Sequence, residues 1–207
     1  MQSLKKFGTA VILCGGKSSR MGFDKCKLKI KGKFLIEVIG EKLEEVFDEI
    51  ILLSNDDDKF KHMKYKVFQD IIPNSGPIGA IYSALKYASS EYVFITACDM
   101  PVVNIDFIKY MMELIQLKQV EGTVACKSEF IEPLYAFYSK TMIEKIENQI
   151  NNQNYKLLQI IDSSKIHYIE ESEVRKYSSN LEIFTNLNYK EDLSLLNKIF
   201  LEDNKKS

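Results

Sequence analysis

Residues 8–25 read Gly-Thr-Ala-Val-Ile-Leu-Cys-Gly-Gly-Lys-Ser-Ser-Arg-Met-Gly-Phe-Asp-Lys, an apolar run that passes directly into a glycine-rich turn. A continuous apolar run is typical of a parallel strand that is buried on both faces. Backbone N–H groups in such a turn are bare and bind phosphate oxygens. Arg20 and Lys25 lie inside the turn, where a long cationic side chain can meet a phosphate. The junction therefore predicts a polyphosphate site, and so a nucleotide.

Two familiar phosphate-binding loops are excluded by spacing. Gly16-Lys17-Ser18 resembles the end of a Walker A loop, but that motif requires a glycine five positions before Gly16, where this chain has Val11. The glycine pair also lacks the Gly-x-Gly-x-x-Gly spacing of a dinucleotide-binding fold. The turn therefore predicts nucleotide binding of another kind.

The basic residues after the turn are interpreted as a solvated strand face. In Lys27-Leu28-Lys29-Ile30-Lys31 the charges alternate with apolar residues, which predicts a half-buried strand with its lysines in water. The whole chain has 28 Lys plus Arg against 29 Asp plus Glu, so it lacks the basic excess that drives nucleic-acid binding. The patch suits one small anion, and we expect no nucleic-acid partner.

Length and composition predict one domain over residues 1–207. No apolar stretch reaches the roughly 18 to 20 residues that span a bilayer, and the first residues show no signal-peptide pattern, so we expect a cytoplasmic protein without a membrane partner. The four cysteines are irregularly spaced and only two histidines accompany them, which argues against structural zinc and favours reduced, non-catalytic thiols.

Alternating strand and helix patterns run along the chain. Strands are predicted over 7–14, 49–54, 66–69, 92–97, 122–126 and 134–138. Helices are predicted over 34–47, 77–88, 102–118, 140–150, 155–161 and 189–201, with a less regular region before the last of them. The alternation predicts an α/β fold, a Rossmann-like three-layer sandwich with a mostly parallel sheet and helices on both faces.

Ligands of such sheets bind outside the carboxyl ends of the strands, where three loops of this chain are predicted to converge. Asp99 leaves a buried strand just before Met100-Pro101, a position suited to holding Mg²⁺ against phosphates. Its alternative is a helix cap, with Asn104 and Asp106 as rival caps.

The loop at residues 70–80 is the second acidic candidate. Asp70 is placed to reach a ribose hydroxyl or a base N–H, and the alternative is an Asx turn. Gly76 and Gly79 permit close approach of the backbone. Asn55, after the second strand, is either a base contact or a turn former.

A family resemblance follows from these motifs. Leu13 to Lys25 resembles the signature of the nucleotidyltransferases that join a nucleoside triphosphate to a phosphorylated acceptor, and Asp24 before Lys25 resembles the branch of molybdenum cofactor guanylyltransferases. Further matches, in the family's order, are Asp70 with 76–80, Thr96-Ala-Cys-Asp-Met-Pro101, Glu132-Pro-Leu-Tyr-Ala136 and 184–192. Cys14 replaces the usual alanine, and 151–158, with Lys156, only weakly resembles the family's basic acceptor-binding stretch.

The resemblance implies a Mg²⁺-dependent transfer of GMP from GTP to molybdopterin carrying molybdenum, with release of pyrophosphate. Its implied catalytic residues are Arg20, Lys25 and Asp99, with Asp99 as the metal ligand. Its implied nucleotide-binding residues are Leu13, Cys14, Gly15, Gly16, Lys25, Asn55, Asp70, Gly76 and Asp99. Its implied acceptor-binding residues are Gly22, Asn186 and Asn188.

The expected organisation is a monomer with a mainly nucleotide-binding half, 1–100, and a mainly acceptor-binding half, 101–207. Transient contacts with other proteins of cofactor biosynthesis are also expected. Without the resemblance, the chemistry of the residues predicts only nucleotidyl transfer. A related cytidylyl- or sugar-nucleotidyltransferase, or a nucleotide-binding regulator without turnover, therefore stays open at this point.

Overall fold

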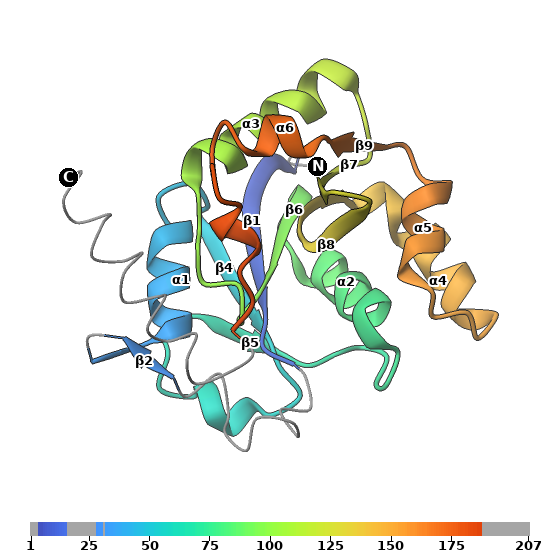
Figure 1. Cartoon of the computed structure of the whole chain (residues 1–207). Coiled ribbons are helices and arrows are strands. Elements are labelled where there is room, and N and C mark those ends of the chain that lie inside the picture. Colours follow the sequence, from blue (N-terminus) through green and yellow to red (C-terminus); the bar gives the residue numbers. More distant parts are fainter. Residues whose placement is uncertain (1–3, 16–27, 31, 188–207) are drawn as a thin grey trace.

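A seven-stranded sheet forms the centre of the protein in the computed structural model, which describes residues 4–15, 28–30 and 32–187 (Figure 1). The strands lie in the order β5-β4-β1-β6-β8-β7-β9. Their bounds are β1 Lys5–Leu13, β4 Glu49–Leu53, β5 Lys66–Phe68, β6 Ser90–Ala97, β7 Gly122–Lys127, β8 Phe130–Ser139 and β9 Ile166–Ile169. The apolar run that opens the sequence is thus a central strand, paired on both sides.

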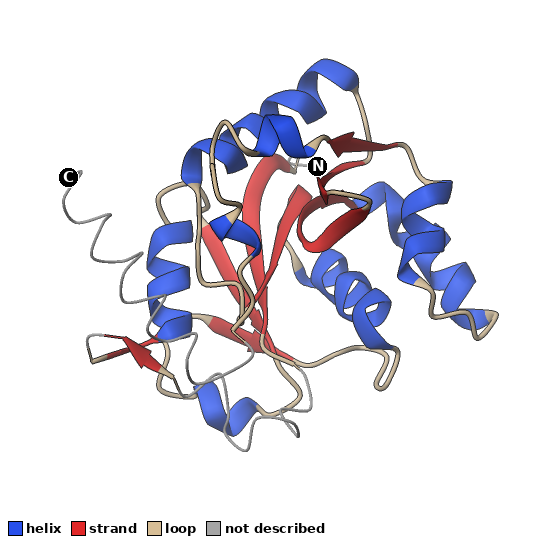
Figure 2. Ribbon diagram, viewed as in Figure 1, coloured by secondary structure: helices blue, strands red, loops and turns tan. Residues whose placement is uncertain are grey.

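Helices cover both faces of this sheet, as Figure 2 shows. One core packs α1 and α3, with α6 and the short helix η5, and the other packs α2, α4 and α5. Their bounds are α1 Leu35–Leu43, α2 Gly76–Tyr87, α3 Ile105–Lys118, α4 Ile143–Asn151, α5 Leu157–Ser163, α6 Glu171–Val174 and η5 Glu182–Phe184. The 3₁₀ turns η3 Asp57–Phe60 and η4 Lys140–Met142 complete the helical elements. The expected three-layer α/β sandwich is confirmed.

One strand runs against the rest. β1 is parallel to β4 and β6, β4 is parallel to β5, and β7 is parallel to β9, whereas β8 is antiparallel to both β6 and β7. The cause is the connection between β7 and β8, which consists of Ser128 and Glu129 and leaves no room for a crossover helix. Ser128 takes a φ of 55° in this hairpin turn.

The basic stretch after the first turn contains a small hairpin where it is described. β2 (Lys29–Ile30) pairs antiparallel with β3 (Lys33–Phe34) through Gly32, whose φ is +86°. Ile30 is buried whereas Lys29 and Lys33 are exposed, so the expectation of a half-buried strand with outward lysines is confirmed for these residues.

A polar cluster joins the amino ends of β4 and β6 to the middle of β1. Glu49 Oε2 accepts hydrogen bonds from Thr9 Oγ1 at 2.8 Å, from Ser89 N at 3.0 Å and from Ser89 Oγ at 2.8 Å. Burial raises the pKa of Glu49, but these bonds and one from Lys66 outweigh it and leave the pKa below its usual value. The cluster fixes the sheet at the edge opposite the strand carboxyl ends.

Several boundaries differ from the predicted ones. α3 begins at Ile105 rather than at residue 102, because Asn104 caps it, and the helix expected over 140–150 opens with a 3₁₀ turn. The region expected to be irregular contains β9, α6 and η5. The helix expected over 189–201 lies outside the described residues. None of the helices that the structure describes has the length and apolar character to cross a membrane.

Candidate active site at the carboxyl edge of the sheet

The first residues after β1, β4 and β6 are tied to neighbouring strands by backbone hydrogen bonds. Cys14 N donates to Leu53 O at 2.8 Å, Ser54 N to Phe68 O at 2.8 Å, and Cys98 N to Leu13 O at 3.0 Å. Because these strands are parallel, the loops that follow them start side by side. Gly15, Asn55, Asp70 and Asp99 therefore belong to one edge of the sheet, as the sequence predicted.

Asn55 and Asp70 hold each other by two hydrogen bonds. Asn55 Nδ2 donates to Asp70 Oδ2 at 2.9 Å, and Asp70 N donates to Asn55 Oδ1 at 3.1 Å. Asp70 Oδ1 is buried and, within the described part of the chain, has no hydrogen-bond partner. A buried carboxylate oxygen without a donor is costly, so this atom suits a ligand that brings an N–H or O–H group.

Asp99 lies in a tight turn after β6 and is partly exposed. Met100 N donates to Ala97 O at 3.0 Å, and the carbonyl of Asp99 accepts from Leu187 N at 2.8 Å. The α3 N-cap is Asn104, whose Oδ1 accepts from Phe107 N at 2.9 Å. The helix-cap alternative for Asp99 is therefore wrong.

The same backbone bond brings the late part of the chain to the site. Asn186 is exposed and directly precedes Leu187, so it lies next to the Asp99 turn, while Asn188 is outside the described residues. Gly16, Arg20, Gly22 and Lys25 also lie outside them. That Arg20 and Lys25 bind phosphate at this loop therefore stays a prediction.

Three glycines shape the edge. At Gly15 a Cβ would meet no atom within 4 Å among the described residues. Gly76 begins α2 with a φ of +66°, which favours glycine. At Gly79 a Cβ would lie 1.7 Å from Ser75 Oγ, so this position needs glycine to let the loop after Asp70 pack on α2.

Glu132 is a further charged residue of the site to which the sequence assigned no role. It lies on β8 and is partly buried. Burial raises its pKa and the charge of Asp99 raises it further, whereas a hydrogen bond from Leu134 N, at 3.2 Å, and the charge of Lys127 lower it. The available signal was an acid between Ile131 and Pro133 in an otherwise apolar strand.

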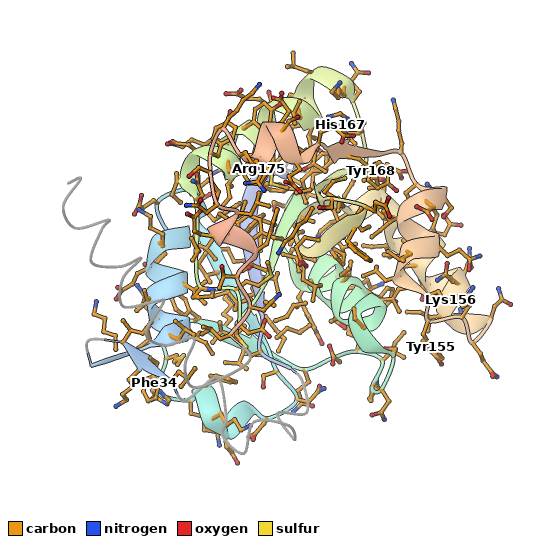
Figure 3. The ribbon with its side chains drawn as sticks, viewed as in Figure 1. Phe34, Tyr155, Lys156, His167, Tyr168 and Arg175 are labelled. Carbon is orange, nitrogen blue, oxygen red and sulfur yellow. The ribbon has the colours of Figure 1, made fainter. Side chains whose placement is uncertain are left out.

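An open groove of about 660 Å³ lies beside β8 and α5. Its wall includes Pro133, directly after Glu132, and Lys156, which precedes α5. Figure 3 shows Tyr155 and Lys156 on the α4–α5 side of the molecule, across from Phe34. Leu158, an exposed apolar residue, also lines this groove.

The candidate cation ligands at this edge are the carboxylate oxygens of Asp70 and Asp99. No group of three or more His, Cys, Asp or Glu side chains is assembled within 4–15, 28–30 and 32–187. Cys14 and Cys98 are buried at the ends of their strands. The arrangement suits a hard cation that shares its ligands with phosphate oxygens and water, as Mg²⁺ does.

The family model described as the MobA-like NTP transferase domain matches residues 10–167. The chain belongs to this family. Its match starts in β1 and ends in β9, so the MobA-like domain includes the whole carboxyl edge from Gly15 to Glu132.

Relatives of this MobA-like chain are similar over nearly their full length. It is 40% identical over 187 residues, 90% of this chain and 89% of the relative, to the molybdenum cofactor guanylyltransferase of Syntrophotalea carbinolica. It is 38% identical over 208 residues, 98% of this chain and 94% of the relative, to a probable molybdenum cofactor guanylyltransferase of Peptoclostridium acidaminophilum.

A solved structure supports the same fold. The molybdopterin-guanine dinucleotide biosynthesis protein A of Archaeoglobus fulgidus matches with a TM-score of 0.80 at 23% identity, covering 94% of this chain and 99% of that one. At this identity the likeness supports the fold alone.

Proposed function

We propose that this protein transfers GMP from GTP to the terminal phosphate of molybdopterin carrying molybdenum, with release of pyrophosphate. The observation that carries the proposal is the 40% identity to a named molybdenum cofactor guanylyltransferase over 90% of the chain. The carboxyl edge supplies groups of the type this reaction needs. In this proposal residues 1–100 mainly bind the nucleotide and residues 101–207 mainly bind the acceptor.

The chemistry is an in-line substitution at the α-phosphorus. An oxygen of the acceptor phosphate forms the new P–O bond, the bond to the bridging oxygen of the β-phosphate breaks, and pyrophosphate leaves with that electron pair. No general base is needed, because a phosphate nucleophile is already ionised at pH 7. The protein therefore works by positioning two anions and offsetting the charge of the transferring group.

Each residue at the edge has a proposed part in this positioning. The N–H groups of Gly15 and Gly16, with Arg20 and Lys25, hold the triphosphate. The backbone at Leu13 and Cys14 forms the floor of the nucleotide site. Gly22, Asn186 and Asn188 face the acceptor, and Asn186 is supported by its position beside the Asp99 turn.

The metal site and the base site are proposed on opposite sides of β1. Asp99 fits Mg²⁺ because it presents hard carboxylate oxygens where the phosphates are expected, and bound Mg²⁺ supplies positive charge to the transferring phosphoryl group. Asp70 Oδ1 is buried without a described donor, which fits an N–H of guanine or a ribose hydroxyl. Asn55 holds Asp70 in place for this contact.

The experiment is incubation of the pure protein with Mg²⁺, molybdopterin and each of the four nucleoside triphosphates in turn, followed by the mass of the product. We expect the guanine dinucleotide and pyrophosphate from GTP alone. A cytidylyl product would assign the related transferase activity instead. Nucleotide binding without any product would assign a regulator, and either result would refute the proposal.

A further inference from the structure

Strand β8 interrupts its pairing with β7 close to the carboxyl edge. Val124 pairs with Ala136, but the next residue, Ala125, pairs with Glu132, so residues 133–135 have no partner on β7. Pro133 lies in this bulge and has no N–H to donate, and its carbonyl accepts from the Tyr138 hydroxyl at 2.8 Å. Bulges of this kind commonly re-aim a side chain beside an active site.

The bulge places Glu132 at the same edge as Asp99. The pairing of β6 with β8 ends at Thr96 opposite Tyr135, and the two strands are antiparallel. Asp99 comes three residues after Thr96, and Glu132 comes three residues before Tyr135. Asp99 therefore lies just past the end of β6, and Glu132 lies in the part of the neighbouring β8 that continues beyond its pairing with β6.

Two carboxylates in this arrangement disfavour each other unless a cation lies between them. Glu132 is partly buried, and partial burial weakens the screening of its charge by water. The hydrogen bond from Leu134 N to Glu132 Oε1 is a neutral donor and offsets only part of this cost. Divalent Mg²⁺ commonly takes one or two carboxylates together with phosphate oxygens and waters.

We propose that Glu132 is the second carboxylate ligand of the divalent cation held by Asp99. This inference rests on the proposed function, because that function supplies the metal and the phosphates. It joins the two halves of the chain at one ion, with Asp99 contributed by the nucleotide-binding half and Glu132 by the acceptor-binding half.

The test is a Mn²⁺ titration of the full chain, followed by electron paramagnetic resonance, with a GTP analogue whose α,β bridge cannot be cleaved. Glu132→Gln keeps the oxygen that accepts from Leu134 N and removes the charge, and Glu129→Gln removes an exposed charge from the same hairpin. We expect Glu132→Gln to weaken Mn²⁺ binding by at least about 10-fold, because removal of a partner that only supports a ligand already costs that much. Glu129→Gln should leave the Mn²⁺ affinity unchanged.

Wild-type Mn²⁺ affinity in Glu132→Gln would overturn the inference, and Glu132 would then have only a structural role as the acceptor for Leu134 N. If this variant does not fold, the wild-type protein is labelled with ¹³C and titrated with substoichiometric Mn²⁺. Loss of the Glu132 carboxyl signal at the same Mn²⁺ ratio as that of Asp99 supports the inference, and loss of the Asp99 signal at a clearly lower ratio overturns it. Product formation by the wild-type enzyme is measured separately, so that failure of the proposed function is distinguished from failure of this inference.

Discussion

Gly15→Ala separates nucleotide binding from folding. The added Cβ would meet nothing within 4 Å among the described residues, and Gly15 does not have the positive φ that disfavours alanine. The free energy of unfolding should therefore change by no more than about 0.5 kcal/mol, as for an exposed position without special contacts. Chemical denaturation of the protein without ligand measures this quantity.

The same methyl group should be harmful once GTP binds. It would occupy the space through which a phosphate approaches the Gly15 N–H, and loss of a charge-assisted hydrogen bond costs about 1.5 to 3 kcal/mol. That corresponds to a Kd for GTP raised by about 10- to 150-fold. Calorimetric titration with GTP and Mg²⁺, without acceptor, measures the change.

Gly122→Ala is the matched control, because it should have the opposite pattern. A Cβ at Gly122 would lie 2.3 Å from the carbonyl oxygen of Phe137, and a backbone atom between paired strands cannot move away cheaply. Such overpacking costs about 1 to 3 kcal/mol of stability, while Gly122 pairs with Tyr138 and Ile166 away from the site. Wild-type GTP affinity in Gly15→Ala, or a loss of stability like that of Gly122→Ala, would refute the assignment of the loop.

Three further predictions concern charge. Asp99→Asn should keep the fold, seen by circular dichroism, and lose turnover at limiting Mg²⁺, because the amide lacks the charge that holds the ion; normal turnover there would remove Asp99 from the metal site. Lys25→Ala should lose about 10- to 150-fold in transfer rate, whereas the exposed Lys33→Ala should lose little, and equal rates would contradict a phosphate contact at Lys25. Glu49 has a folded pKa below its usual 4.5, so it stabilises the protein above that pH and this contribution disappears as the pH falls through the folded pKa. Urea unfolding at pH 7 and pH 3 should therefore show that Glu49→Gln has a lower free energy of unfolding than the wild type at pH 7, and that it loses less of this free energy at pH 3. An equal loss in the two proteins would contradict this.

Local sequence patterns predicted most of the fold. The strands at the centre of the sheet are continuous apolar runs, since both faces are covered, and α2 begins with Pro77 in its first turn as expected. These signals are local, and burial on both sides leaves little ambiguity. The carboxyl-edge position of Gly15, Asp70 and Asp99 follows from the same reasoning, because parallel strands end together.

The reversed strand could not be predicted in the same way. β7 and β8 are both largely apolar, and an apolar run does not show whether a strand lies parallel or antiparallel to its neighbours. The turn at Ser128 also lacks the glycine that usually marks a tight hairpin. The strand expected over 134–138 therefore lacks residues 130–133 at the start of β8. The metal-ligand role proposed for Glu132 depends on the bulge, which arises from pairing between strands, and the acid before Pro133 is its only local signal.

The hydrogen bond from Leu187 N to the carbonyl of Asp99 joins residues far apart in the order of synthesis. Ribosomes make the chain from its amino end, and the segments that emerge first begin to fold first. The turn that carries Asp99 is made early, but its backbone acceptor receives this partner only when residue 187 has been added. A chain released before that point would contain every strand of the sheet and lack this bond, so late truncations should damage the Asp99 turn before they damage the fold.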